Sequence, residues 1–167
     1  GQPGPLSAPV SATPADTTPP ATPMGVTIIP LEPQSQIEVR WTTTTVDVEG
    51  HIDSSGVTGY KVYRYDAENA SLSSGTQIGG TVPQPGPGIL VAVTIDTSGN
   101  LRPPYGEKTY WYRVRAIDGS GNLSGYSAAV GGHLKDITPP DPPKNLTAEG
   151  GDTYIQLQWT PNTEPDL

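Results

Sequence analysis

The sequence predicts an all-β fold in which two sheets pack face to face as a sandwich. Its apolar residues come in short alternating runs of Val, Ile, Tyr and Trp, and we find no window with the 3.6-residue period of a helix. The 20 Gly and 20 Pro of the 167-residue chain fall largely between these runs, where turns and linkers are expected. A tandem repeat indicates one complete domain followed by part of a second.

Seven strands are expected in the complete domain, each a short apolar run bounded by turn residues. They lie near residues 24–29, 36–41, 59–65, 76–79, 89–96, 108–117 and 127–134. Side chains alternate between the two faces of a strand, so every second residue of each run should point inward. The predicted core positions are Trp41, Tyr60, Val62, Tyr110, Tyr112 and Val114, with Trp159 in the same role in the second copy.

The repeat is visible in two pairs of segments. DTTPPATPMGVTI at residues 16–28 resembles DITPPDPPKNLTA at residues 136–148. QIEVRW at residues 36–41 then matches YIQLQW at residues 154–159, and in both an Ile, a Val or Leu, and a Trp alternate on one face. The second copy stops after its second strand, so the sequence is expected to be a piece of a longer chain. Two strands are marginal alone, so we expect contacts outside the first domain to order residues 144–160.

The repeat divides the chain into four segments. Residues 1–20 are a linker rich in Pro, Thr and Ala, and residues 21–136 are the complete domain. Residues 137–143 are a second, Pro-rich linker, and residues 144–167 hold the first two strands of the second domain. Clustered prolines favour extended backbone, so both joints should behave as short semi-rigid spacers.

The stretch TIDTSGNLRPPYGEKTYWYRVRAIDGSGNLSGYS, residues 94–127, resembles the second half of a fibronectin type III domain of bacterial or phage type. The positions that match the family motif are Asp96, Thr97, Leu101, Tyr110, Tyr112, Val114, Ala116, Gly121, Asn122 and Ser124. GYKVYR at residues 59–64 resembles the family's third strand, and Trp41 its second-strand Trp. The resemblance implies a seven-stranded, two-sheet, immunoglobulin-like sandwich followed by a partial second copy.

Three kinds of function remain open, because a fold alone does not determine function. The leading expectation is a non-enzymatic structural spacer and interaction module of a larger tandem-repeat protein, such as a bacterial surface protein or a phage tail tip or fibre. The first alternative is an accessory module of a secreted polysaccharide-degrading enzyme. The second is an adhesion or receptor-binding module that uses the long loops 42–58 and 79–88 or the face around Trp111.

All three functions place the protein outside the cell, on a cell surface or on a virion. The expected partners are other domains or subunits of the same assembly, with a protein or glycan ligand as a further expectation. A net charge of −8 argues against nucleic acid, and no apolar run reaches the roughly 18 residues of a membrane span. His51 and His133 lie in different elements and no Gly-x-Ser-x-Gly motif occurs, so neither an enzyme nor a cofactor is expected.

The loop at residues 42–58 carries side chains that could bind a divalent cation. The weak metal candidates are Asp47, Glu49 and Asp53, with His51 between them. Their spacing matches no established Ca²⁺ loop, so a solvated polar loop is the alternative interpretation. DTSGN at residues 96–100 and DGSGN at residues 118–122 resemble fragments of a Ca²⁺ loop, but each carries one carboxylate and turn chemistry explains both.

An exposed basic and aromatic face is expected on two neighbouring strands. Trp111, Arg113 and Arg115 should point outward from the sixth strand, beside Lys61 and Tyr63 on the third. Such a surface suits a protein or glycan partner. The alternative is that these side chains pair with one another across the strands and serve only the sheet.

Overall fold

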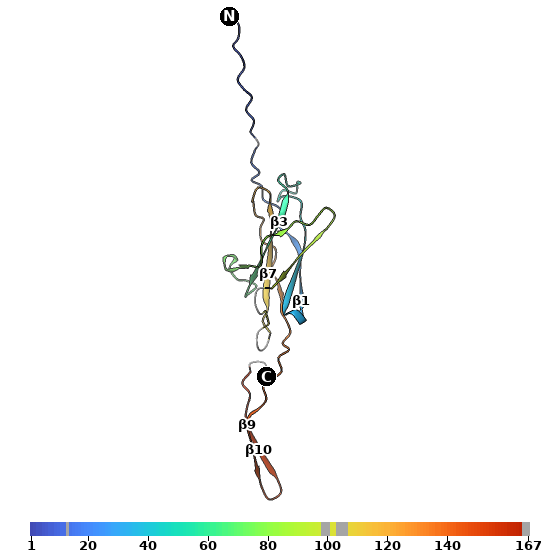
Figure 1. Cartoon of the computed structure of the whole chain (residues 1–167), viewed down its shortest axis with the longest axis vertical. Coiled ribbons are helices and arrows are strands. Elements are labelled where there is room, and N and C mark those ends of the chain that lie inside the picture. Colours follow the sequence, from blue (N-terminus) through green and yellow to red (C-terminus); the bar gives the residue numbers. More distant parts are fainter. Residues whose placement is uncertain (13, 98–100, 103–106, 165–167) are drawn as a thin grey trace.

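The computed structural model describes residues 1–12, 14–97, 101–102 and 107–164. Its strands between residues 24 and 132 form two antiparallel sheets, ordered β1-β2-β6 and β4-β3-β7-β8 (Figure 1). The first sheet contains β1 (Met24–Leu31), β2 (Gln36–Thr42) and β6 (Val91–Asp96). The second contains β4 (Thr76–Gln77), β3 (Val57–Tyr65), β7 (Tyr110–Asp118) and β8 (Val130–Gly132). Two 3-10 turns, η1 (Glu32–Gln34) and η2 (Leu72–Ser74), follow β1 and precede β4.

The expected all-β fold class is confirmed by this strand pairing. In β7 the even-numbered residues from Tyr110 to Asp118 are buried and the odd-numbered residues from Trp111 to Ile117 are partly exposed, as the alternation of the sequence predicts. Between the sheets, the rings of Trp41 and Tyr60 meet edge to face with centroids 5.2 Å apart. The core also contains Ile37, Val39, Val62, Ala92, Tyr112, Val114, Ala116 and Leu134. No helix among the described residues is long and apolar enough to cross a membrane.

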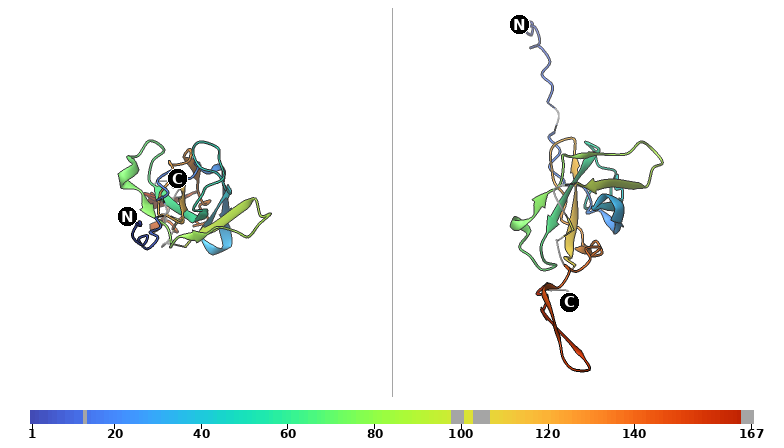
Figure 2. Two further views of the ribbon diagram at one scale, coloured as in Figure 1. Left: turned by 90° about the horizontal axis from the view of Figure 1, so that it is seen from above. Right: turned by 60° about the horizontal axis from the view of Figure 1, so that its bottom comes forward.

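One edge of the second sheet differs from the single strand expected near residues 76–79. There β4 is only two residues long, and β5 (Val82–Pro83) continues along the same edge of β3. Gly79 and Gly80 separate the two pieces, and Gly79 has a φ of +63°, a conformation that favours glycine. A broken edge with a proline in it offers few free backbone groups to another strand. The segment between β5 and β6 then projects from the side of the sandwich (Figure 2).

The C-terminal strands β9 (Lys144–Gly150) and β10 (Ile155–Thr160) form a separate two-stranded sheet. In Figures 1 and 2 this hairpin lies beyond one end of the sandwich, and the N-terminal segment extends from the opposite end. The expected core role of Trp159 in a second domain stays a prediction, and in this two-stranded hairpin the side chain is 54% exposed. The physical reason is that a two-stranded sheet has no facing layer against which to bury a Trp side chain.

Candidate functional site

The structure brings the five residues of the expected basic and aromatic face together. In the pairing of β3 with β7, Lys61 lies opposite Arg115 and Tyr63 opposite Arg113. Trp111 lies two residues further along the same face of β7, and all five side chains are partly exposed. The face therefore exists as a surface of the second sheet.

The two arginines of this face are engaged with the backbone of neighbouring loops. Arg115 donates from Nε to the carbonyl of Ser124 at 2.6 Å. Arg113 donates from one nitrogen to the carbonyl of Ser127 and from another to the carbonyl of Glu68, both at 3.1 Å. These bonds hold the segment after β7 and the turn after β3 against the sheet. The geometry thus agrees better with the structural alternative than with a free cationic patch.

Aromatic rings fill the space around these arginines. Arg115 lies over the ring of Tyr126 at 4.6 Å, and Tyr63 meets the same ring edge to face at 5.5 Å. Burial, and then the nearby Tyr126 hydroxyl, raise the pKa of Tyr63 above its usual value and that of Tyr65 to about 12. The phenols are therefore neutral packing groups and offer no acid or base near neutral pH.

The side chain of Trp111 points outward but is only partly exposed to solvent. It lies opposite Gly131 of β8, and a Cβ on that glycine would approach the indole ring to 3.2 Å. The glycine therefore lets the ring lie close over the backbone of β8. Only part of the ring is left for a partner.

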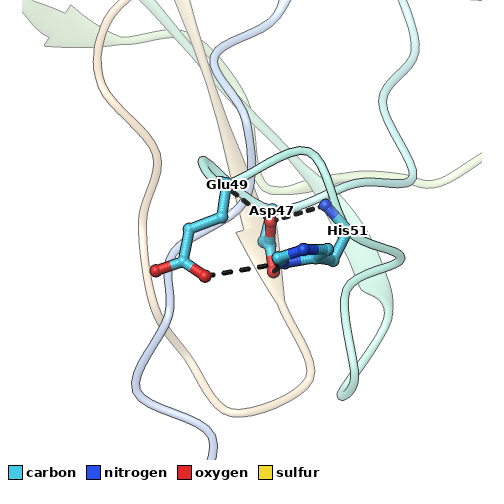
Figure 3. A group of neighbouring side chains, drawn as sticks. All are labelled: Asp47, Glu49 and His51. Carbon is cyan, nitrogen blue, oxygen red and sulfur yellow. Dashed lines mark hydrogen bonds and ion pairs between the residues drawn. The ribbon is translucent and has the colours of Figure 1, made fainter.

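The loop between β2 and β3 forms a compact polar turn around Asp47 (Figure 3). Its Oδ1 accepts hydrogen bonds from the backbone amides of Glu49 at 2.8 Å and His51 at 3.0 Å. The Nδ1 atom of His51 lies 3.5 Å from Glu49 Oε2 and 3.8 Å from Asp47 Oδ2. Glu49 and His51 are exposed, and backbone amides of the turn donate to Asp47, so this cluster has the properties of a solvated loop.

Asp53 does not join Asp47 and Glu49, contrary to their grouping in the sequence. It is buried beside Asp118, at the end of β7, and Asp16, in the segment before β1. The separation arises because the loop turns between Asp47 and Asp53, where Val46 and Ile52 form an isolated antiparallel bridge. Of the two fragments that resemble Ca²⁺ loops, DGSGN therefore contributes Asp118 to this second cluster. Residues 98–100 of DTSGN lie outside the described residues.

Asp96 is a fully buried acid, and the sequence marks it only as a position of the family motif. Its Oδ2 accepts hydrogen bonds from Arg64 Nη1 and from the hydroxyl of Tyr112, both at 3.0 Å. Burial, followed by the negative charge of Asp96, raises the pKa of Tyr112 far above its usual value. The three groups come from β6, β3 and β7, so they connect the two sheets through polar contacts. The Asp-Thr pair of the family motif was the available signal for this contact.

The fold and these clusters define the class of protein: a two-sheet β-sandwich module whose polar groups mostly serve its own loops. No family model matches the chain. Exoglucanase A of Cellulomonas fimi is 34% identical over 155 residues, a match that covers 89% of this chain and 14% of that protein. The chain thus spans only a small part of this curated relative.

Among solved structures, the third fibronectin III domain of the human KIAA0343 protein is similar, with a TM-score of 0.48 and 16% identity. The match covers 82% of this chain and 99% of that one. Because the TM-score is below 0.5, the assignment of the fold rests on the strand order and pairing described above.

Proposed function

We propose that this chain is a non-catalytic, fibronectin type III-like spacer module of a glucan-degrading enzyme. In this proposal residues 21–136 form one complete domain and residues 144–167 begin the next. The observation that carries the proposal is the identity of 34% with Exoglucanase A along 155 residues. This relative favours the accessory-module alternative over a bacterial surface protein or a phage tail component.

The arrangement of the chain supports a spacing role. The N-terminal segment and the C-terminal hairpin extend from opposite ends of the sandwich (Figure 1). Pro-rich segments join both ends, and they favour extended backbone with limited bending. Such a module would hold the domains before and after it apart. A spacer of this kind helps an enzyme whose catalytic and binding parts must act on different points of one insoluble polymer. In this proposal the protein works outside the cell.

A chimera of the relative tests the proposal. The segment of Exoglucanase A that matches this chain would be replaced by residues 1–167, and in a control by a flexible Gly/Ser linker of equal length. We expect the chimera to hydrolyse insoluble glucan at the rate of the unmodified enzyme. The Gly/Ser variant should be slower on the insoluble substrate and unchanged on a soluble oligosaccharide, because only the spacing is lost. A chimera as slow as the Gly/Ser variant would refute the spacer role.

A binding assay separates this function from adhesion through the Trp111 face. The isolated chain is mixed with insoluble glucan and centrifuged, and we expect it to stay in the supernatant and to release no sugar. Retention on the polymer that is lost in Trp111→Ala would support the adhesion alternative and count against a simple spacer. Release of sugar by the isolated chain would contradict its non-catalytic role.

A further inference from the structure

Three carboxylates from distant parts of the sequence meet where the chain enters the sandwich. Asp16 precedes β1, Asp53 lies in the loop between β2 and β3, and Asp118 ends β7. One carboxylate oxygen of each lies within 4.8 Å of those of the other two. Asp53 is 5% exposed and Asp118 2% exposed. Within the described part of the chain, the ion pairs of the structure involve none of the three, so no ion pair with a Lys or Arg offsets their repulsion.

A second observation points to a missing ligand. Asp53 contributes a carboxylate oxygen to this cluster, and its Oδ2 atom is buried without a hydrogen-bond partner among the described residues. Its other oxygen, Oδ1, accepts hydrogen bonds from the backbone amide and the hydroxyl of Ser55, both at 3.1 Å. A buried charged oxygen left without a partner is costly and rare in folded proteins. A cation bound between the three carboxylates would satisfy it.

The geometry suits an ion with oxygen ligands. Two oxygens that each lie about 2.3–2.6 Å from one Ca²⁺ are separated by at most about 5 Å. Further oxygens are close: Asn122 Nδ2 donates to the main-chain oxygen of Asp16 at 3.2 Å and to Asp118 Oδ2 at 2.8 Å. Rotation of this amide would present its own oxygen instead. With water, these groups reach the six or more oxygens that Ca²⁺ requires.

The side chain of Asp16 is held in position by two backbone amides. Its Oδ1 accepts a hydrogen bond from the Thr18 amide at 3.0 Å, and its Oδ2 accepts one from the Ser55 amide at 3.2 Å. Asp16 is therefore already fixed toward the loop that carries Asp53.

We propose that Asp16, Asp53 and Asp118 bind one Ca²⁺ ion, which fastens the N-terminal linker to the sandwich. The all-oxygen ligand set is unsuited to Zn²⁺, and three carboxylates in an irregular cluster suit Ca²⁺ better than the strict octahedron of Mg²⁺. The ion would join the linker, the loop after β2 and the turn after β7. Calcium would then control how rigidly the preceding part of the protein is held.

Calorimetric titration of residues 1–167, freed of metal with a chelator, tests the proposal. We expect one Ca²⁺ to bind per chain with a Kd of about 10⁻⁴ M and to raise the melting temperature. Asp53→Asn and Asp118→Asn keep the shape of the side chain and should weaken binding about tenfold or more. Asp47→Asn, in the exposed cluster nearby, is the matched control and should leave binding unchanged. Far-UV circular dichroism checks that each variant folds.

Hydrogen exchange gives a second readout that reports on the linker. Calcium should slow exchange in peptides covering residues 16–21 of the wild type and have no effect in Asp16→Asn. The absence of binding heat together with an unchanged melting temperature would overturn the proposal. Equal loss of affinity in Asp47→Asn would move the site to the exposed cluster, and equal affinity for Mg²⁺ would refute the assignment to Ca²⁺. None of these results depends on whether the parent protein degrades glucan.

Discussion

The strands β2 and β10 have nearly the same pattern but opposite surroundings. QIEVRW places Trp41 inward, where it is 1% exposed, whereas YIQLQW leaves Trp159 54% exposed. β2 lies between β1 and β6 with the second sheet across from it, and β10 pairs with β9 in a two-stranded sheet. The comparison teaches that alternation specifies a strand and its faces. Burial of the apolar face depends on neighbouring strands and a facing sheet.

Substitution of the two tryptophans should give the largest contrast. Trp41→Ala removes a core side chain in contact with Tyr60 and should lower the free energy of unfolding by about 3–5 kcal/mol. Trp159→Ala should change it by less than about 0.5 kcal/mol, because the ring gains little from burial in this chain. Urea unfolding followed by far-UV circular dichroism measures both values.

Two controls separate packing from other effects of these substitutions. A chain that ends at Pro143 lacks the hairpin and should unfold with the same free energy as the whole chain. Trp41→Phe keeps an aromatic ring and removes the Nε1 donor, which has no hydrogen-bond partner among the residues that the structure describes, so it should cost less than Trp41→Ala. Similar losses from Trp41→Ala and Trp159→Ala would contradict the comparison.

β2 has β6 as a second neighbouring strand, which β10 lacks in its two-stranded sheet. We expect β6 to stabilise the sandwich through its buried acid. Asp96 ends β6 and pairs in register with Ile37 of β2. Asp96→Ala leaves Arg64 Nη1 and the Tyr112 hydroxyl without this acceptor and should cost about 3 kcal/mol of unfolding free energy. Asp66→Ala breaks an exposed pair with Lys108 and serves as the control, with an expected cost of less than about 1 kcal/mol. Equal effects of the two variants in urea unfolding would count against a stabilising role for the buried network.

The smallest expected change in the free energy of unfolding appears at alkaline pH. It should arise from a residue of the sandwich and not from the hairpin. Burial, then the neighbouring Tyr126, raises the pKa of Tyr65 from 10.0 to about 12. Because the folded state favours the protonated phenol, this contribution is fully present below pH 10 and is lost as the pH rises through about 12. Unfolding free energies measured across this window should fall less in Tyr65→Phe. The matched variant Tyr154→Phe, in the exposed hairpin, should behave like the wild type, and a flatter curve in that variant would contradict the assignment to Tyr65.

Much of the fold follows from alternation in the sequence. The runs around Trp41, Val62 and Val114 are core strands because each has inward apolar positions at every second residue. The broken edge formed by β4 and β5 could not be predicted in the same way. Each piece is two residues long, too short to show a period, and its pairing depends on how β3 approaches it.

The cluster of Asp16, Asp53 and Asp118 could not be predicted from the spacing of residues within one loop. In the sequence Asp53 and Asp118 belong to separate loops, and neither has the neighbours of an established Ca²⁺ loop. The fold places them side by side and adds Asp16 from the linker. The partners of Arg113 and Arg115 were hidden for a similar reason: they are backbone carbonyls of segments whose path cannot be derived from side-chain pattern.

The opposite exits of the chain also determine how the sandwich responds to mechanical force. Traction on the two ends pulls β1 one way and β8 the other, and these strands lie together where Gly132 packs against Ile28. β1 is joined to β2, and β8 to β7, by antiparallel hydrogen bonds that run across the strands. The load therefore shears several bonds of a ladder at once and does not open them in succession. We expect a domain held in this way to resist unravelling when the chain is pulled along its length.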